Sequence, residues 1–553
     1  MSYARKSMLV LCGVLCAQAA QQEETATFKS KVNVVMVPVV VRDRQGRADG
    51  SLGKEDFELF DKGRRQAITT FSVERTGAGA PAPSGSAAGA PSAGAWAALP
   101  ERFTAYLFDD VHLSFGDLAR AREAASRHFD AALGAGDRAA IFSTSGRTML
   151  DFTDDRAKLR ETLLRLQPRP VALSGSRECP DLGYYQADLI VEKHDREALN
   201  AATTELMACE SIDERMRGRA ELKAEIAARK TIAAYGHEAQ IALGVLTDVV
   251  RRMALAPGRR SIVLISPGFL TPTQLDEKTR IIDRAIRSGV VVSALDARGL
   301  YTTIPGGDAS QQTYTIAVAQ IKETYARATA RLSGDVMAEL AEGTGGTFFE
   351  NSNDLEGGLG RIAGAPETIY VLGFSPQNLK LDGSFHKLKV ALKDRRGLSV
   401  QARRGYYESP QVENEAGQRK VEIEEALFSR EEVHDLPIEM RAQFTKPGGV
   451  AAKINVLARI DLTQVRFHKV DGRDRSDLTI TSGLFDRNGN YVTSIQRVLT
   501  LQACDRASEA AAPPEITVRT SFNVKPGAYA IRLVVRDTEG QLMSAQNGAI
   551  EIQ

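Results

Sequence analysis

The residues most able to do chemistry stand in the stretch YLFDDVHLSF, residues 106–115. An apolar run ends there in two acids, Asp109 and Asp110, and Ser114 follows Asp110 by four residues. Carboxylate and hydroxyl oxygens are hard ligands of the kind that Mg²⁺ prefers. The same acids could instead cap the N-termini of helices, where the helix dipole stabilises negative charge. The sequence leaves both interpretations open.

Catalytic motifs are weak by comparison. Ser266, in LISPGFL, follows an apolar run but lacks the first glycine of the G-x-S-x-G nucleophile motif. The chain contains no H-E-x-x-H, and its Gly-rich stretch EGTGGT, residues 342–347, lacks a phosphate-binding lysine and precedes a predicted strand. We therefore expect no enzymatic activity, with a hydrolase as the minor alternative.

The composition is that of a folded protein without strong charge bias. Of the 553 residues, 43% are hydrophobic and 25% are charged, and the 71 basic and 70 acidic side chains leave a formal net charge of +1. This balance gives no general attraction to nucleic acid or to anionic membranes. The chain is too long for one hydrophobic core, so we expect about three domains.

Residues 1–19 have the pattern of a secretory signal. MSYARKS carries two basic residues, the apolar run MLVLCGVLCAQA is too short to span a bilayer, and Ala17-Gln18-Ala19 gives it a small-x-small end. The alternative, a buried terminal segment, would leave Arg5 and Lys6 beside a core without partners. We expect an exported protein, periplasmic or extracellular, with no transmembrane segment in the mature chain.

Export changes the meaning of the cysteines. Cys12 and Cys16 leave with the signal, so that Cys179, Cys209 and Cys504 remain. In an oxidising compartment Cys179 and Cys209 can form a disulfide that closes their own loop and contributes about 3–4 kcal/mol by the chain-entropy estimate. Two separate buried thiols are the alternative. Cys504 is then the odd one, either buried or available for an intermolecular bridge.

The pattern of elements indicates an α/β domain between β segments. Strands and helices alternate over residues 101–364, which predicts a mostly parallel sheet with helices on both faces. A flexible Ala/Gly/Pro/Ser linker, residues 76–100, precedes it. The β segments 27–75 and 365–410 are each too short for a two-sided core, so we expect them to share one β-sandwich. Residues 432–553 alternate at the strand period and predict a separate immunoglobulin-like β-sandwich.

The order of motifs in the α/β segment resembles that of a von Willebrand factor A (VWA) domain. After the acidic loop come GDRAAIFS, RRSIVLISPGF, IRSGVVVSALD and LAEGTGGTFFE. The flanking pieces, among them VPVVVRDRQG and YVLGFSP, are similar to those of an exported bacterial family described as VWA-related, over residues 30–410. The resemblance implies a Rossmann-like fold used for adhesion or assembly, often through a divalent cation, without a general catalytic activity.

The resemblance also implies that the acidic loop is a metal-ion-dependent adhesion site, whose first motif is D-x-S-x-S. With Asp110 as the first acid, Ser114 matches the second serine, but His112 stands where the first serine belongs. A neutral imidazole is a poor ligand for Mg²⁺, though acceptable for Mn²⁺ or Zn²⁺. In the third loop Ser266-Pro267 replaces the usual Thr-Asp-Gly, and the threonine of the second loop has no clear match. The site is therefore degenerate, and its candidate ligands for a weakly bound Mg²⁺ or Mn²⁺ are Asp109, Asp110, Ser114 and Ser266, with Asp296 at another strand end on the same edge.

Residues 171–236 form an insertion in this pattern, and alanine and charged residues at helical spacing make its second half helical. The insertion begins beside the predicted ligand edge. Tyr184 and Tyr185 are expected there on an exposed turn, where aromatic side chains favour partner binding. The sequence equally favours the interpretation that they pack the insertion onto the sheet. Together with His112 they are the candidate partner contacts.

Two classes of function remain after these exclusions. The first is an exported adhesion or scaffold protein that binds a protein or cell-envelope partner through the top face of the VWA-like domain. The second is a structural module of an envelope or secretion assembly, in which the sandwiches bind and the VWA-like site is inert. Metal-dependent partner binding would support the first class, and loss of binding on deletion of residues 432–553 would support the second.

We predict that Cys179 and Cys209 are joined in the exported protein. A peptide map of the mature, oxidised chain under non-reducing conditions should contain both cysteines in one linked pair of peptides, because the compartment favours disulfides. Reduction before digestion is the control and should separate the pair. Two free thiols in protein recovered from the exported compartment would contradict the link.

Overall fold

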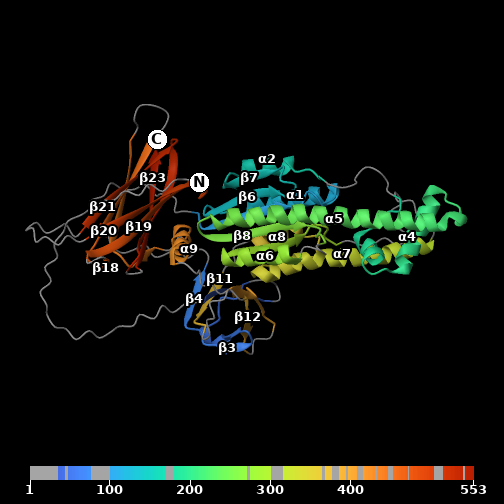
Figure 1. Ribbon diagram of the computed structural model, residues 1–553, viewed down its shortest axis with the longest axis horizontal. Coiled ribbons are helices and arrows are strands. Elements are labelled where there is room, and N and C mark those ends of the chain that lie inside the picture. Colours follow the sequence, from blue (N-terminus) through green and yellow to red (C-terminus); the bar gives the residue numbers. More distant parts are fainter. Residues whose placement is uncertain are drawn as a thin grey trace, which may run out of the picture.

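The computed structural model describes residues 35–43, 48–75, 100–169, 179–270, 275–300, 316–363, 368–376, 385–393, 397–407, 415–429, 432–445, 452–470, 473–502, 515–539 and 542–552. The predicted signal (1–19), the predicted linker (76–100) apart from its last residue, and Cys504 lie outside these ranges. Figure 1 shows an α/β domain, a helical arm that extends from it, and β-domains on its other sides.

The α/β domain is built on a six-stranded sheet in the order β10-β9-β8-β5-β6-β7. Neighbouring strands run parallel except at β7, which pairs antiparallel with β6 at one edge. The bounds are β5 Arg102–Phe108, β6 Asp137–Ser143, β7 Met149–Thr153, β8 Arg259–Ser266, β9 Val290–Asp296 and β10 Phe348–Phe349. The predicted α/β class with a mostly parallel sheet is confirmed.

Helices cover both faces of this sheet (Figure 1). One face carries α1 (Phe115–Ala132), α2 (Arg156–Arg165) and α8 (Leu355–Ala363), and the other carries α5 (Arg217–Ala254), α6 (Leu275–Arg287) and α7 (Ile316–Thr344). Strand β5 lies between the two cores, with Phe103 and Leu107 in one and Tyr106 and Phe108 in the other. Burial on both faces explains the near-continuous apolar run that precedes Asp109.

The insertion forms an arm that extends beyond the sheet (Figure 1). Helices α3 (Tyr184–Val191) and α4 (Arg196–Glu210) pack against α5, and the short 3₁₀ helix η2 (Glu214–Met216) connects α4 to it. A disulfide joins Cys179 to Cys209, whose Cα atoms are 6.6 Å apart. Nζ of Lys322, on α7, lies 2.7 Å from Oε1 of the buried Glu205 on α4. The arm is therefore held by a covalent link and a partly buried ion pair in addition to its small apolar core.

The predicted end of the insertion, at residue 236, needs correction because α5 continues through it. The first half of α5 buries Ala220, Ala224 and Ala228 in the arm, and its second half buries Leu246 and Val250 against the sheet. One 38-residue helix thus belongs to both parts. Within the described ranges, none of the helices combines the length and apolar content needed to cross a bilayer.

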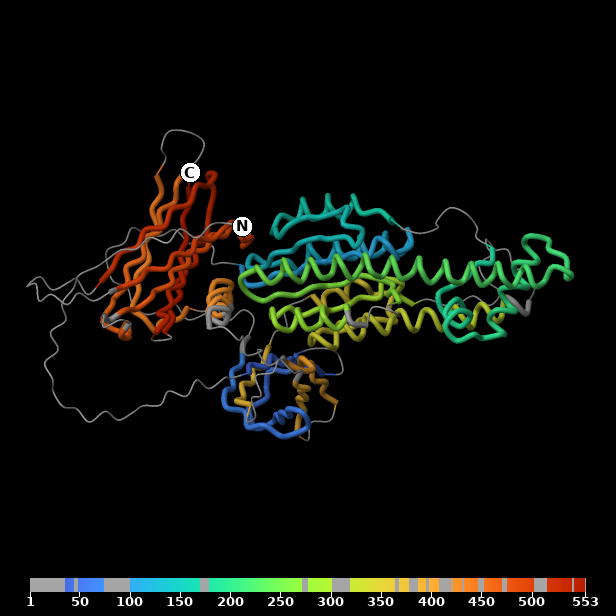
Figure 2. Tube along the Cα trace, in the orientation of Figure 1, coloured from blue at the N-terminus to red at the C-terminus, as the bar shows by residue number. Residues whose placement is uncertain are grey.

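The small β-domain takes its strands from both sides of the α/β domain in the sequence. Its two sheets have the orders β13-β1-β11-β4 and β14-β12-β2-β3. β1 and β4 both pair with β11, and β2 pairs with β12. The elements are β1 Val35–Arg42, η1 Lys54–Asp56, β2 Phe57–Asp61, β3 Arg64–Gln66, β4 Thr70–Arg75, β11 Thr368–Phe374, β12 Phe385–Leu392, β13 Ser399–Ala402 and β14 Gly405–Tyr407. Strands of the segments 27–75 and 365–410 therefore pair with one another, as expected for a shared domain, and Figure 2 shows their blue and orange traces intermingled.

A buried polar network ties these two chain segments together. Nδ1 of His386, on β12, lies 3.0 Å from Oδ1 of Asp61 on β2. The hydroxyl of Tyr406, on β14, donates to Oδ2 of Asp61 at 3.1 Å. All three side chains are buried, so the strands that enter and leave the α/β domain are fixed by hydrogen bonds as well as by apolar packing.

The C-terminal β-domain has two sheets with a core between them. The first contains β15 (Val433–His434), β18 (His468–Val470), β19 (Arg473–Asp486), β20 (Tyr491–Gln502), β22 (Gly527–Asp537) and β23 (Met543–Ile552), and the second contains β16 (Ile438–Thr445), β17 (Ala452–Asp461) and β21 (Glu515–Val524). Helix α9 (Glu415–Leu427) packs on β22 from outside.

This C-terminal domain covers the amino end of the parallel sheet. Nη2 of Arg260, at the start of β8, donates to the carbonyl of Phe428 at 2.9 Å. Nδ2 of Asn490 donates to the carbonyl of Phe152, on β7, at 3.2 Å. Figure 2 shows the C-terminal domain and the arm at opposite ends of the molecule. The carboxyl end of the sheet therefore faces away from the C-terminal domain.

A buried tyrosine–histidine pair makes the stability of the α/β domain depend on pH. The hydroxyl of Tyr106 lies 2.9 Å from Nε2 of His128, and both side chains are buried between β5 and α1. Burial lowers the pKa of His128 from 6.5 to about 4, and the nearby charge of Arg102 adds to this shift. The unfolded chain therefore takes up a proton near pH 6.5 that the folded protein does not bind until about pH 4.

We predict that the free energy of unfolding falls between pH 6.5 and pH 4, with about 3 kcal/mol of the fall due to His128. The contribution is complete above the unfolded pKa and is lost as the pH approaches the folded one. In His128→Gln the amide oxygen can accept the tyrosine hydrogen bond but does not titrate, so the fall should be smaller. Urea denaturation at neutral pH and near pH 4 compares the two proteins, and equal falls would contradict the assignment.

Candidate functional site

Polar side chains gather at the carboxyl end of the parallel strands. Asp109 and Asp110 directly follow β5, Thr144 follows β6, and Ser266 is the last residue of β8. The strand order reverses at β5, which lies between β6 and β8. Open parallel sheets bind ligands at such a switch point, in the crevice outside the carboxyl ends of the strands. The structure thus brings Asp109, Asp110 and Ser266 to one place.

Asp109 is completely buried and accepts hydrogen bonds on both carboxylate oxygens. Oγ1 of Thr144 donates to Oδ1 at 2.8 Å, and Oγ of Ser266 donates to Oδ2 at 2.6 Å. Nδ1 of His112 lies 2.9 Å from each of the two oxygens. Three side chains from three loops therefore satisfy this one carboxylate.

Asp110 is also buried and is held by the loop that follows β6. The backbone N–H of Ser145 donates to Oδ1 at 2.8 Å, and its hydroxyl donates to Oδ2 at 2.6 Å. Oγ1 of Thr144 lies 3.2 Å from Oδ1 of Asp110, so this hydroxyl is shared between the two acids. The side chain of Asp110 thus orders the second loop.

The charges of Asp109 and His112 stabilise each other. Burial by itself raises the pKa of Asp109, but the charge and hydrogen bond of His112 and the hydroxyls of Ser266 and Thr144 outweigh it, so that the pKa is lowered. Burial acts in the same way to lower the pKa of His112, and the Asp109 carboxylate raises it overall, with a smaller effect from Glu238. The pair therefore favours carboxylate and imidazolium.

The far side of the His112 ring faces helix α5. Nε2 lies 3.9 Å from Oε2 of Glu238, on α5. This nitrogen is buried and has no hydrogen-bond partner in the described part of the chain. The imidazole stacks on Phe269, with ring centroids 5.4 Å apart and planes inclined by 17°. His112 thus lies between the sheet edge, the third loop and the long helix of the insertion.

Two candidate ligands have other roles. The backbone N–H of Asp117 donates to Oγ of Ser114, which caps the N-terminus of α1, and the Ser114 hydroxyl donates to the Asp117 carboxylate at 2.7 Å. In this arrangement the hydroxyl of Ser114 is engaged with its own helix, and its role as a ligand stays a prediction. Asp296 forms a bidentate pair with Arg298, with Nη2 and Oδ2 2.7 Å apart.

These side chains do not fit a divalent cation as they are arranged. All four carboxylate oxygens of Asp109 and Asp110 accept hydrogen bonds, and the hydroxyl of Ser114 faces its own helix. An octahedral Mg²⁺ site needs oxygen ligands that are free to approach to about 2.0–2.1 Å. Among the residues that the structure describes, no group of three or more His, Cys, Asp or Glu side chains could hold a metal ion.

Sequence reasoning missed four residues of this site: Thr144, Ser145, Glu238 and Phe269. The sequence gives no match for a second-loop threonine, but the structure places Thr144, which directly follows the strand DRAAIFS, beside Asp109. The available signal is the strand end itself, since β6 pairs parallel with β5 and its end must lie beside Asp109. Glu238 and Phe269 carry no local motif that points to His112.

The predicted exposed turn at Tyr184 and Tyr185 is also wrong. Tyr184 is the first residue of α3 and is buried, with its ring centroid 5.8 Å from that of Tyr235 on α5. Tyr185 is half-buried and lies against Tyr325 of α7, with a centroid distance of 6.0 Å. Both side chains pack the helices of the arm together, because an aromatic side chain buries a large apolar area.

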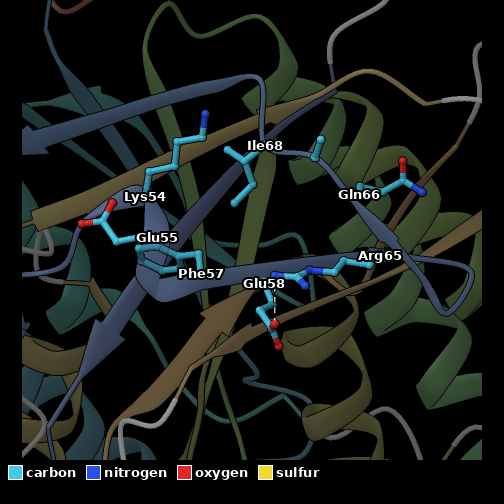
Figure 3. Close-up of a pocket in the computed structure, with 8 residues that line it drawn as sticks. Lys54, Glu55, Phe57, Glu58, Arg65, Gln66 and Ile68 are labelled. Atoms are coloured by element: carbon cyan, nitrogen blue, oxygen red, sulfur yellow. Dashed lines mark ion pairs between the residues drawn. The ribbon is translucent and has the colours of Figure 1, made fainter.

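A pocket of about 570 Å³ lies far from these acids, in the small β-domain (Figure 3). Phe57 and Ile68 line it together with charged side chains, and the guanidinium of Arg65 pairs with Glu58 at 3.1 Å. The lining residues are Lys54, Glu55, Phe57, Glu58, Arg65, Gln66, Ala67 and Ile68. None of the candidate site residues contributes to this pocket.

Comparisons with known proteins give weak likenesses. No family model matches the sequence, and no curated protein matches it. Among solved structures, the conserved hypothetical protein BatB from Bacteroides thetaiotaomicron is 14% identical over 47% of this chain and 95% of its own, with a TM-score of 0.21. An aerotolerance-related membrane protein from Bacteroides fragilis NCTC 9343 is 14% identical over 48% and 96%, with a TM-score of 0.24. A β-glucuronidase from Bacteroides uniformis is 9% identical over 34% of this chain and 19% of its own, with a TM-score of 0.16. These scores are too low to assign a family.

We predict that Thr144→Val destabilises the protein by about 1–3 kcal/mol, because it removes a donor that two buried carboxylates share. Valine has nearly the same shape as threonine, so the loss of stability measures the contribution of the hydroxyl group. Urea denaturation of the full chain measures it. Thr204→Val is the matched control, since the Thr204 hydroxyl is exposed and bonds only to the backbone of its own helix; its effect should stay within about 0.5 kcal/mol. Equal effects of the two substitutions would contradict the shared role of Thr144.

Proposed function

We propose that this chain is an exported, non-enzymatic binding protein whose VWA-like domain engages a protein or cell-envelope partner at the carboxyl end of its sheet. The observation that carries the proposal is the convergence of three loops, from β5, β6 and β8, on two buried acids at the switch point of the strand order. Such a constellation fixes the loops that a partner meets.

Exposed apolar side chains flank these loops and support a role in partner binding. Phe115, the first residue of α1, is 74% exposed, and Leu300, in the loop that follows β9, is 64% exposed. The guanidinium of Arg120, on α1, donates to the carbonyl of Arg298 at 3.1 Å, which links α1 to the loop that follows β9. Large exposed aromatic and apolar side chains are frequent anchors of protein interfaces.

The arrangement of hydroxyls favours binding over catalysis. Oγ of Ser266 donates to Asp109 and accepts the backbone N–H of Gly268 at 2.9 Å, and Oγ1 of Thr144 donates to the buried acids. A nucleophilic hydroxyl would instead donate to a general base beside an open cleft. His112 directs Nδ1 to Asp109 and not to a hydroxyl.

We predict that Phe115→Ala and Leu300→Ala each lower partner capture several-fold. Full-length protein is immobilised and incubated with solubilised native envelope, and the retained proteins are quantified by mass spectrometry. Leu164→Ala is the matched control, because Leu164 is 73% exposed but lies on α2, outside the loops of the site. Partners that bind wild type and Leu164→Ala but not the two variants define the interface. Capture that neither Phe115→Ala nor Leu300→Ala alters would contradict the proposal.

One observation favours a second candidate, binding through the C-terminal domain. Strand β20 pairs with β19 alone among the described strands, and its Val492 and Val498 are 47% and 42% exposed. A long edge strand can accept another strand through its backbone. Val498→Lys in the same capture experiment separates the candidates, because a charge on the edge opposes strand addition. Loss of capture in this variant alone would favour the second candidate.

A further inference from the structure

Two departures from the expected metal-site pattern contact each other in the structure. His112 stands where the first serine of D-x-S-x-S belongs, and the stretch Ser266–Phe269 replaces Thr-Asp-Gly in the third loop. The ring of Phe269 stacks on the imidazole of His112, and the hydroxyl of Ser266 donates to the same Asp109 that His112 faces. The loops after β5 and β8 thus contact each other directly, although they are far apart in the sequence.

The backbone of the third loop, after β8, contains a turn that requires glycine. Gly268 has a φ of +84°, and a Cβ at this position would lie 2.3 Å from the carbonyl oxygen of Ser333. Only glycine fits such a turn. The turn lets the N–H of Gly268 hold the hydroxyl of Ser266 and places Phe269 beside His112. It contributes no third carboxylate to the site.

The ring of His112 has carboxylates at both of its nitrogens. Nδ1 lies 2.9 Å from the two oxygens of Asp109, and Nε2 lies 3.9 Å from Glu238 of α5. The side chain is only 10% exposed. A positively polarised group between two carboxylates is what a bound cation supplies in a metal site.

We propose that this is a metal-independent site, in which the imidazole of His112 takes the place of the divalent cation between Asp109 and Glu238. The inference rests on the proposed function only in that it concerns the same sheet edge. It states that a side chain of the protein fixes the three loops and helix α5 relative to one another. Mg²⁺, Mn²⁺ and chelators then have no effect on the edge that a partner meets.

The test uses the cation alone and needs no partner. The melting temperature of the full-length protein is measured with MgCl₂, with MnCl₂ and with EDTA. Wild type should melt at the same temperature in all three. His112→Ser restores the D-x-S-x-S pattern and removes the imidazole, so its melting temperature should rise by several degrees in Mn²⁺ or Mg²⁺ through binding to the native state. The rise should disappear when Asp110→Asn is added.

His112→Asn is the matched control. Its amide N–H₂ can donate to Asp109 as Nδ1 of the imidazole does, so this variant should fold and show no response to cations. If His112→Ser does not fold, the amount of Mn²⁺ bound per wild-type chain after equilibrium dialysis gives a second readout. This amount is expected to equal the background of a metal-free reference protein. One Mn²⁺ per wild-type chain, lost in Asp109→Asn, would overturn the proposal, and so would a folded His112→Ser that ignores both cations. Either result leaves the partner-capture experiment unaffected.

Discussion

A carboxylate with no exposed surface, that of Asp109, sits at the end of the central strand β5, and the carboxyl edge of the α/β domain is organised around it. An uncompensated buried charge costs several kcal/mol. Asp109 is therefore met by a hydroxyl from the β6 loop, a hydroxyl from the β8 loop and the imidazole of its own loop. Because these donors come from different loops, neutralising one charge also fixes the relative positions of three loops.

The rest of the fold holds this edge from several directions. Helix α5, which has 38 residues, connects the arm to the sheet. It also places Glu238 beside His112. The amino end of the sheet rests on the C-terminal domain, through Arg260 and Asn490 among other residues. The small β-domain contains the chain segments that precede and follow the α/β domain, and strand pairing and the hydrogen bonds around Asp61 join these segments. Long, paired elements of this kind favour one fixed arrangement of this edge.

The hydrogen-bond pattern also restricts what the edge can do. Its hydroxyls are engaged with carboxylates, and its imidazole is engaged with Asp109. Beside the loops, the apolar side chains of Phe115 and Leu300 are exposed, and so is the charged side chain of Arg120. These exposed apolar side chains are the ones that the proposed function assigns to partner contact.

The sequence by itself determined the α/β class and the position of the acids at the end of β5. It also indicated that the two short β segments beside the α/β domain share one domain. These features follow from strand and helix periods and from strand counts, which are local properties of the chain. It did not determine which side chains meet the acids. Thr144 reaches Asp109 because β6 pairs with β5 in a register that sets Ser143 beside Phe108. Phe269 lies beside His112 because β8 pairs with β5. Tyr184 is buried because α3 packs against α5. Strand order, register and helix packing join residues that are distant in the chain, and only the tertiary structure fixes them.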